Sequence, residues 1–303
     1  MGRKVKNQIL SAVSIEAVAS DGKGVARRNN QVVFVEGVAP GDIVDIRVIR
    51  KKRNYLEAVV EQVVQYSHLR ADPFCSHFGT CGGCKWQHIA YPHQLVLKRQ
   101  LVIDSLQRIG GLEFPEVAET LASPQTQYHR NKLEFTFSNR RWLNQQEINS
   151  GTFLNRNVLG FHKPRQFDKI VDIDQCYLQP DPSNQIRNSV RAYAYKHQLG
   201  FYDIRGKKGF LRNLIVRTAS SGELMVILQV GHDDRTLKEL MHHLKEQYPD
   251  ITSLHYVIND KGNETFFDLP VHLYAGTEHI TDTMGALQFR IGAKSFYQTN
   301  GPQ

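Results

Sequence analysis

Residues 75–88 read CSHFGTCGGCKWQH and hold three of the four cysteines in the chain, Cys75, Cys81 and Cys84. The fourth, Cys176, stands far along the sequence in IVDIDQCYL, so a site shared by all four has to be assembled by folding. Structural zinc usually takes two close pairs of ligands, whereas only one C-x2-C pair is present here. A loop around an iron-sulfur cluster commonly supplies three thiolates, while a remote residue supplies the fourth.

Two glycines, Gly82 and Gly83, separate the last pair of cysteines. Because they lack side chains, they let the backbone approach inorganic sulfide and donate N–H hydrogen bonds to sulfur. The spacing favours an iron-sulfur cluster, but it leaves two alternatives open: a zinc site, and cysteines that bind no metal. His77 and His88 flank the loop. With four cysteines available, we expect these histidines to be surface or supporting residues rather than ligands.

The composition is that of a soluble globular protein with more than one domain. The chain has 303 residues, of which 41% are hydrophobic and 22% charged. No apolar run approaches the ~20 residues that a membrane helix needs. The first residues, MGRKVKNQIL, lack the apolar segment of a secretory signal, so we expect a cytoplasmic protein with reduced cysteines. A net charge of +8 favours a polyanionic partner such as nucleic acid.

The first ~65 residues predict a small all-β unit. DIVDIRVIR alternates, with Val44, Ile46 and Val48 on one face, which is the period of a half-buried strand. QVVFVEG and ILSAVSIEAV are further strand candidates, and turn signals stand at SDGKG, RNN and APGD. Short strands at this spacing are typical of an oligonucleotide-binding barrel. The basic run RKKRN, residues 50–54, falls at a strand end, where it is either a solvated turn or an RNA contact.

The rest of the chain predicts an α+β domain. HQLVLKRQLVIDSLQRIGG has apolar residues at helical intervals and ends at Gly110 and Gly111; we expect most of this apolar stripe to pack in the core. KLEFTFS is a strand, and LRNLIVRT and LMVILQV form a hairpin whose loop is residues 220–223. Two more helices are predicted near residues 183–197 and 235–247.

Several segments together resemble, in their order, the RNA uracil-5-methyltransferases: CSHFGTCGGCKWQHIAYPHQLVLKR, YHRNKLEFTFS, GFHKPRQFDKIVDIDQCYL, GFLRNLIVRT and KSFYQTN. The best fit is the subgroup with an iron-sulfur cluster and an N-terminal TRAM domain, typified by the bacterial 23S ribosomal RNA enzyme. The resemblance covers essentially the whole chain, and the cysteine loop and FYQTN are its most specific parts. It implies methyl transfer from S-adenosylmethionine to C5 of uracil, with 23S ribosomal RNA as the expected partner.

The resemblance also implies roles for particular residues. Four cysteines match the ligands of a [4Fe-4S] cluster: Cys75, Cys81, Cys84 and Cys176. Basic residues of the barrel would contact RNA: Arg47, Arg50, Lys51, Lys52 and Arg53. Arg130 and Phe296 would lie near the flipped target uracil, and Gln298 would contact S-adenosylmethionine.

The implied order of domains is a TRAM barrel, the cluster loop, a connecting helix, an α+β central domain and the start of a methyltransferase domain, over residues 1–66, 67–92, 93–124, 125–292 and 293–303. In the family a cysteine thiolate adds to C6 of uracil and a carboxylate removes the C5 proton.

All four cysteines are assigned to the cluster and the sequence stops at Gln303. We therefore expect the Rossmann-like catalytic domain, with its nucleophile and base, to be absent, and the chain to be inactive. The apolar stripe of the connecting helix would then be exposed. The alternative is a stand-alone RNA-binding module with an iron-sulfur cluster or zinc and no catalytic activity.

Overall fold

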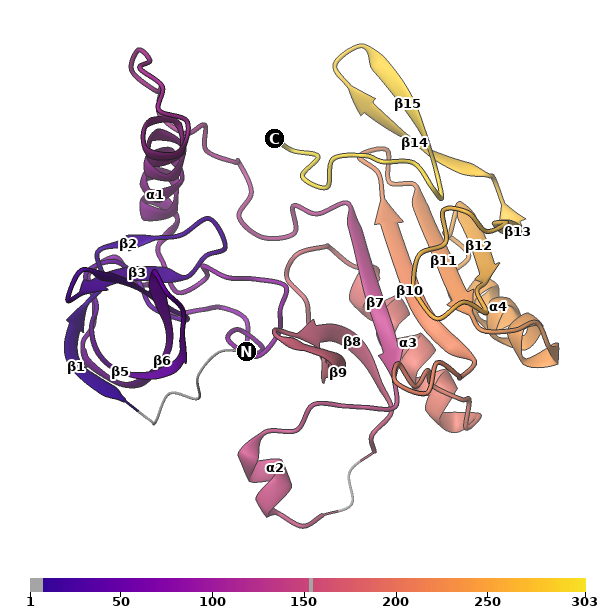
Figure 1. Ribbon diagram of the computed structural model, residues 1–303. Coiled ribbons are helices and arrows are strands. Elements are labelled where there is room, and N and C mark those ends of the chain that lie inside the picture. Colours follow the sequence, from indigo (N-terminus) through magenta and orange to yellow (C-terminus); the bar gives the residue numbers. More distant parts are fainter. Residues whose placement is uncertain (1–7, 153–154) are drawn as a thin grey trace. The chain divides into compact units, whose positions relative to one another are not determined.

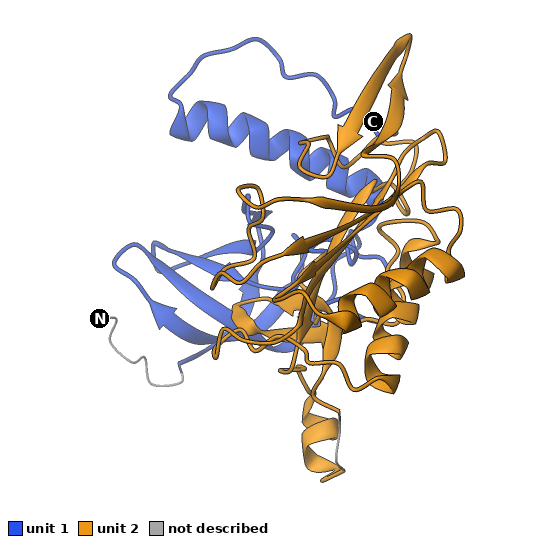
Figure 2. Cartoon of the chain, turned by 90° about the vertical axis from the view of Figure 1, so that its right-hand side faces the viewer, with its two compact units in different colours: residues 1–79, 84–122 blue, residues 80–83, 123–303 orange. Residues whose placement is uncertain are grey.

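The computed structural model describes residues 8–152 and 155–303, which form two compact units (Figure 1). The first unit lies within residues 1–79 and 84–122, and the second contains residues 80–83 and 123–303 (Figure 2). Residues 1–7, with which the predicted barrel range of 1–66 begins, lie outside the described residues.

Strands of the first unit form one sheet that curves into a barrel, in the order β1-β5-β6-β4-β3-β2 (Figure 1). They are β1 (Ile9–Ser14), β2 (Ala17–Val18), β3 (Gly24–Arg28), β4 (Gln31–Val35), β5 (Ile43–Lys51) and β6 (Tyr55–Gln65). Val44, Ile46 and Val48 of β5 are buried inside, as the period-two pattern predicts. The strands β3 and β6 are not among those expected from the sequence.

A helix, α1 (Tyr91–Asp104), follows the barrel and continues as a π-helical turn over Ser105–Ile109. Pro92 lies in its first turn, where the missing N–H costs no intrahelical hydrogen bond. The predicted position of this helix is right, but the predicted core packing of its apolar stripe is wrong. No residue of α1 is buried, and Val96 and Val102 are exposed.

A seven-stranded mixed sheet, in the order β13-β12-β11-β10-β7-β8-β9, forms the centre of the second unit. Its strands are β7 (Lys132–Ser138), β8 (Val158–Lys163), β9 (Gln166–Asp172), β10 (Leu211–Thr218), β11 (Leu224–Val230), β12 (Ser253–Ile258) and β13 (His272–Gly276). β11 and β12 run parallel and are connected through α4 (Arg235–Gln247). α4 and α3 (Ser183–Lys196) cover one face of the sheet (Figure 1).

Both faces of the central strands β10 and β11 are buried. On one face, Leu214 packs among residues of α3 and α4. On the other face, Ile215 packs with Ile280 and Ile291 of the hairpin formed by β14 (His279–Met284) and β15 (Leu287–Gly292). Double coverage explains why LMVILQV is a nearly continuous apolar run instead of an alternating one.

A short helix, α2 (Gln145–Asn149), lies between β7 and β8. Its N-terminus is closed by a capping box: the Asn144 side chain accepts the Glu147 N–H, and the Glu147 carboxylate accepts the Asn144 N–H, both at 2.8 Å. Across residues 8–152 and 155–303, no helix combines the length and apolar character that crossing a membrane requires.

Candidate functional site

The segment that contains Arg130 pairs with the segment that contains Gln298, although they are far apart in the sequence. Arg130 and Asn300 form an antiparallel β-bridge. The backbone N–H of Asn131 donates to the Thr299 carbonyl at 2.9 Å, and its side-chain Nδ2 donates to the Gln298 carbonyl at 2.8 Å. Arg130, which was expected near the target uracil, and Gln298, which was expected to contact S-adenosylmethionine, are thus both held at the beginning of β7.

A buried arginine holds the same C-terminal segment from the sheet. Arg217 of β10 is 5% exposed, and its guanidinium donates to the Ser295 carbonyl at 2.8 Å. Burial lowers the pKa of Arg217, and the charge of Glu134 opposes this shift. The backbone around Phe296 and Gln298 is therefore anchored on both sides while both side chains are exposed, Phe296 to 87%. Sequence reasoning identified neither Arg217 nor Asn131, since each acts through backbone carbonyls of a distant segment.

The predicted RNA-binding residues of the barrel differ in their environments. The Arg47 guanidinium pairs with the Glu61 carboxylate on the adjacent strand β6. Arg50 Nη1 lies 3.7 Å from Glu57 Oε1. Lys51, Lys52 and Arg53 occupy the end of β5 and the turn that follows, where the Lys52 N–H donates to the Tyr55 carbonyl at 2.9 Å. The turn therefore offers more of its charge to a polyanion than Arg47 does.

A second turn, RNN at residues 28–30, lies at the same end of the barrel; sequence reasoning identified it as a turn but gave it no role in RNA binding. β4 and β6 are parallel neighbours with Val32 opposite Tyr55, so the turns that precede these strands lie at the same end of the barrel. The first of these turns brings Arg28, which is exposed, to that end. Phe34 and Tyr55 form an edge-to-face pair there, with ring centroids 5.5 Å apart. Cations beside half-exposed aromatic rings are the combination that binds single-stranded nucleic acid.

The cysteine loop is attached to the barrel through the residues that follow its last cysteine. Trp86 Nε1 donates to the Gly22 carbonyl at 3.2 Å, and His88 Nε2 lies 3.0 Å from the Val38 carbonyl. Gly22 has φ +85°, which favours glycine, and a Cβ atom there would lie 2.9 Å from the Lys85 side chain, which would have to move. His88 is buried, and burial lowers its pKa. Its contact with the Val38 carbonyl supports the loop, and its expected absence from a ligand set stays a prediction.

Cys81 and the two glycines after it belong to the second unit. The Gly83 N–H donates to Cys81 Sγ at 3.3 Å, and the Gly82 N–H donates to the His162 carbonyl at 3.2 Å. A Cβ atom on Gly82 would lie 2.8 Å from that carbonyl oxygen. The Gly83 N–H thus donates to a cysteine sulfur, whereas the close approach of the Gly82 backbone is to a carbonyl oxygen, and the expected approach to inorganic sulfide stays a prediction.

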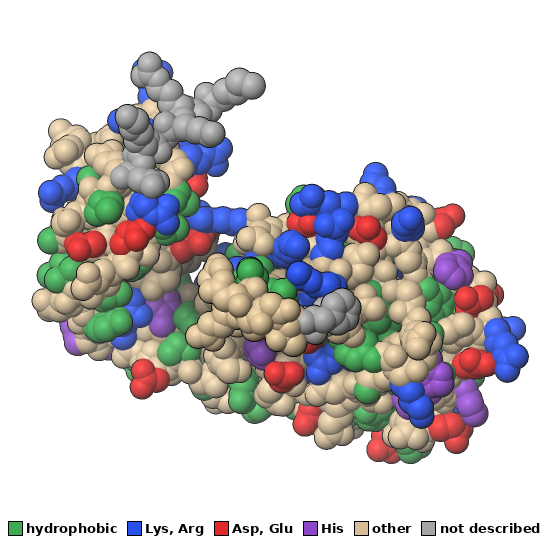
Figure 3. All heavy atoms as spheres, turned by 90° about the horizontal axis from the view of Figure 1, so that it is seen from below, with side chains coloured by type: hydrophobic (Ala, Val, Ile, Leu, Met, Phe, Trp, Pro, Cys, Tyr) green, Lys and Arg blue, Asp and Glu red, His purple; other side chains and the backbone are tan. Residues whose placement is uncertain are grey.

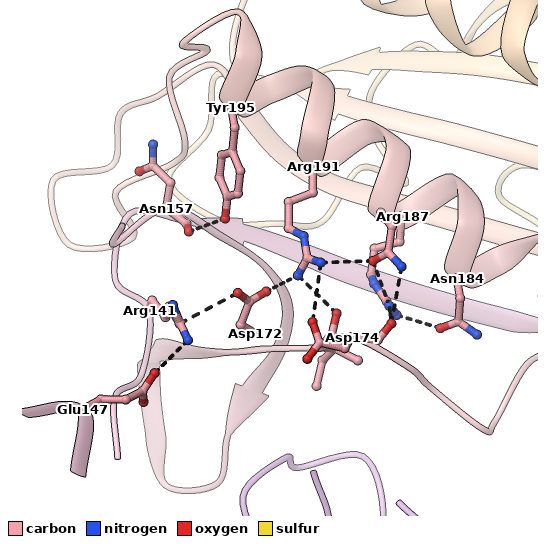
Figure 4. A network of polar contacts seen from close by, with 11 residues as sticks. Arg141, Glu147, Asn157, Asp172, Asp174, Asn184, Arg187, Arg191 and Tyr195 are labelled. Carbon is pink, nitrogen blue, oxygen red and sulfur yellow. Dashed lines mark hydrogen bonds and ion pairs between the residues drawn. The ribbon is translucent and has the colours of Figure 1, made fainter. Parts of the chain in front are cut away.

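A polar network fixes the backbone around Cys176, which is 7% exposed (Figure 4). Asn184 of α3 accepts the Cys176 N–H at 2.8 Å and donates to the Cys176 carbonyl at 3.0 Å. Arg187, fully buried, donates to Asn184 Oδ1 at 2.9 Å and to the Asp174 carbonyl at 2.6 Å. Arg191 of the same helix pairs with Asp172. Burial lowers the pKa of Arg187 to about 10, so it still carries a positive charge at neutral pH.

The surroundings of these cysteines suit thiolates that bind a metal or a cluster. The N–H of Gly83 and the positive charge of Arg187, which interacts electrostatically with Cys176, both stabilise negative sulfur. The four cysteines are divided between the units, with Cys75 and Cys84 in the first. Among the described residues, no group of three or more His, Cys, Asp or Glu is arranged to hold a metal ion. The cluster therefore stays a prediction.

Comparisons with known proteins agree with the barrel and with the second unit. Residues 11–60 match the TRAM domain family. A Bacteroides thetaiotaomicron protein described as an uncharacterized RNA methyltransferase is 47% identical over 291 residues, which are 94% of this chain and 64% of that protein. An uncharacterized RNA methyltransferase of Porphyromonas gingivalis is 45% identical over 96% of this chain and 64% of its own length.

A solved structure matches as well, with a TM-score of 0.66 and 25% identity. It is the Pyrococcus abyssi tRNA (uracil-54, C5)-methyltransferase in complex with S-adenosyl-L-homocysteine, and the match covers 95% of this chain and 61% of that one. The chain thus spans somewhat more than three fifths of the length of these relatives.

One expectation is corrected by these matches. We expected the methyltransferase domain to be missing from this fold. However, 95% of this chain superposes on a solved methyltransferase and 94% aligns with the Bacteroides protein. A missing catalytic domain is therefore not supported. The expectation rested on the position of the last residue and on the assignment of all four cysteines to a cluster, and neither is a property of the fold. The expected inactivity loses its basis with it. Residues 11–60 thus form a TRAM domain, and nearly the whole chain is similar to two proteins described as uncharacterized RNA methyltransferases.

Proposed function

We propose that this chain is part of an S-adenosylmethionine-dependent RNA methyltransferase that modifies C5 of uracil. The observation that carries the proposal is the pairing of Asn131 with Thr299 and Gln298, because it fixes Arg130 beside the segment that ends in FYQTN. The tRNA uracil-5 methyltransferase of similar fold, bound to S-adenosylhomocysteine, supports the reaction class and the cofactor.

The roles proposed for the anchored residues follow from their exposure. The Phe296 ring, 87% exposed on a fixed backbone, is available to stack on a base that has left its helix. Arg130 supplies a cation and hydrogen-bond donors to the same base or to its phosphate. Gln298 is exposed and has its carbonyl fixed by Asn131, so its side chain can orient S-adenosylmethionine, which supplies the methyl group when bound.

The barrel supplies the sequence-independent part of RNA binding. Arg28, Lys51, Lys52 and Arg53 lie at one end of it, with Phe34 and Tyr55 beside them. Cations at this end neutralise phosphates and release counterions, while the aromatic pair offers a stacking surface.

The experiment is a methylation assay on the full-length protein with unmodified 23S ribosomal RNA and transfer RNA, followed by mass spectrometry of the nucleosides. We expect 5-methyluridine in 23S ribosomal RNA. Its appearance in transfer RNA alone would keep the reaction and overturn the substrate, and its absence from both would overturn the proposed function. Arg130→Ala should lower the rate about 100-fold, because misplacing the target base is costly. Arg290→Ala, an exposed arginine of β15, is the matched control and should leave the rate unchanged.

We further propose that Cys75, Cys81, Cys84 and Cys176 bind a [4Fe-4S] cluster. Protein purified without oxygen should contain about four iron and four acid-labile sulfide atoms per chain. Cys176→Ser should lose iron and sulfide together, whereas His88→Gln, which changes the loop but no proposed ligand, should keep both. Zinc without sulfide in the parent protein would replace the cluster with a zinc site.

A further inference from the structure

A single exposed aromatic side chain on β9 lies under a cation. Phe167 is 66% exposed, and the Arg205 guanidinium lies over its ring, 5.9 Å from the ring centre. One exposed apolar residue is ordinary on a protein surface. An arginine held over the ring is a more specific arrangement, because a cation above an aromatic face also favours stacking of a nucleobase beside it.

A buried carboxylate fixes Arg205 in this position. Asp168 is 4% exposed, its Oδ2 lies 2.6 Å from Arg205 Nε, and Arg140 Nη1 lies 3.8 Å from the same oxygen. Burial raises the pKa of Asp168, but the hydrogen bond and the charge of Arg205 outweigh it, so this pKa stays below its usual range. Asp168 is therefore ionised at neutral pH. Arg205 is held in place before any ligand arrives, which lowers the entropic cost of binding.

The loop that carries Arg205 is built to present two more cations. Asp203 Oδ1 accepts the Arg205 N–H at 3.0 Å, and the Asp203 N–H donates to the Lys208 carbonyl at 2.7 Å. A Cβ atom on Gly206 would lie 3.0 Å from the Asp203 carboxylate, so the turn is tight. Lys207 and Lys208 project from it and are exposed, and within the described parts of the chain no ion pair joins either of them to a carboxylate.

We propose that Phe167, Arg205, Lys207 and Lys208, here called the Phe167 surface, bind single-stranded RNA outside the barrel. Figure 3 shows Lys and Arg side chains grouped over part of the second unit, with Asp and Glu side chains among them. The lysines neutralise phosphates, and Phe167 stacks on an unpaired base. The exposed ring argues for a single strand, since the bases of a duplex are already stacked on each other. This inference rests on the proposed function, because it supplies a second contact for the same RNA substrate.

The test measures binding of a fluorescent uridine-containing single strand, and of the same sequence in a duplex, to the full-length protein by anisotropy. Phe167→Ala should weaken binding of the single strand about tenfold, since a stacked base is worth that much, and leave the duplex unchanged. Phe167→Tyr keeps the ring and should bind as the parent does. Unchanged thermal unfolding shows that the exposed substitution has not damaged the fold.

The charge contribution is tested by salt. Lys207→Gln with Lys208→Gln should reduce the slope of log affinity against log salt by about 1.4, because two phosphate contacts to a single strand are lost. Lys238→Gln with Lys245→Gln on α4 removes the same charge from an exposed helix face and should leave the slope unchanged.

These results separate the inference from the proposed function. Equal loss of slope in both lysine pairs, or unchanged binding by Phe167→Ala, overturns the Phe167 surface while methylation of uracil by the parent protein still supports the enzyme. If Phe167→Ala weakens binding of the single strand but the parent protein methylates no uracil, the result supports an RNA-binding surface without that reaction. A parent protein that binds no RNA overturns both.

Discussion

Each of the two units contains an arginine that binds buried polar groups, but the two arginines have different kinds of partner. In the first unit, Arg70 forms two parallel hydrogen bonds with Asp42, Nε to Oδ1 at 2.9 Å and Nη2 to Oδ2 at 2.7 Å, and Asp42 is fully buried. In the second unit, Arg212 is 2% exposed and donates to the carbonyls of Asn259, Lys261 and Asn263 at 2.9, 2.7 and 2.6 Å. No carboxylate bonds to the Arg212 guanidinium among the contacts of the described residues.

The difference shows what each arginine organises. A carboxylate can take four hydrogen bonds, and Asp42 also accepts the N–H of Ala39 and of Ser67, so it joins a barrel turn to the chain leaving β6. Arg212 instead gathers carbonyls of an irregular loop that could not satisfy one another, and its guanidinium lies 4.0 Å over the Tyr202 ring. The Arg70 arrangement depends on the ionised carboxylate of Asp42. The Arg212 arrangement depends on the shape of the loop and on the number of N–H donors that the guanidinium offers.

The largest effect should come from Asp42→Ala. It leaves two backbone N–H groups and the Arg70 guanidinium without their acceptor, and breaking a buried charge pair typically costs about 3–5 kcal/mol. The chain has two tryptophans, so in a Trp142→Phe background the fluorescence of Trp86, which is hydrogen-bonded to the barrel, reports urea unfolding of the first unit.

The control is Asp21→Ala in an exposed turn of the same unit, where the carboxylate pairs only with Lys23 at the surface. A loss in Asp42→Ala as small as that in Asp21→Ala would show that Asp42 does not join the barrel to the following chain.

Arg212→Met should have the next largest effect, about 2–3 kcal/mol, because several loop carbonyls lose their donor while the apolar stem is replaced. In a Trp86→Phe background, Trp142 reports unfolding of the second unit. Arg290→Met, at an exposed arginine of β15 in the same unit, serves as the control. Equal stability of Arg212→Met and the parent would mean that water replaces Arg212 as the donor to the loop carbonyls. Only the charge pair of Arg70 and Asp42 in the first unit would then contribute to stability.

A smaller effect on the stability of the first unit is expected when the pH is lowered. Burial raises the pKa of Asp42, but the hydrogen bonds from Arg70, Ala39 and Ser67 outweigh it, so the pKa is lowered in the fold. The stability contributed by Asp42 is therefore fully present above its unfolded pKa of about 3.9 and is lost as the pH falls through the folded pKa. The stability difference between the parent and Asp42→Ala should shrink over that range. The difference between the parent and Arg212→Met should not follow it, and a parallel decline of both differences would contradict the distinction.

Local pattern was enough to predict elements, but not the contacts that join them. The alternation of DIVDIRVIR gave the buried face of β5, and the helical spacing near residues 235–247 matches α4. The same spacing identified α1 but said nothing of what its apolar residues meet, so core packing was wrongly expected. Periodicity reports a face of an element, whereas its partner is decided by the rest of the fold.

The candidate site shows the same limit. Arg130 and Gln298 were selected by resemblance. Asn131 donates to the carbonyls of residues 298 and 299, but no local sequence pattern predicts this contact, because Gln298 is 167 residues away. Arg212 and Arg217 are equally hidden within an apolar strand, where a sequence shows their charge but not the carbonyls they reach. The missing catalytic domain was inferred from an end of the sequence and from a cluster assignment of all four cysteines that no contact among the described residues tests.

The smallest effect is expected where a charge pair is exposed. Arg27 Nη1 lies 2.7 Å from Glu16 Oε2, and both side chains face solvent, at 57% and 43% exposure. Such pairs contribute about 0–1 kcal/mol, because water and salt screen the attraction and ordering two long side chains costs entropy. Arg27→Gln, measured by Trp86 fluorescence in the Trp142→Phe background, should therefore lie within this range and lose its effect at 1 M salt. A cost close to that of Asp42→Ala would mean that burial does not set the value of a charge pair in this barrel, and the comparison between the units would have to be rebuilt on geometry instead of desolvation.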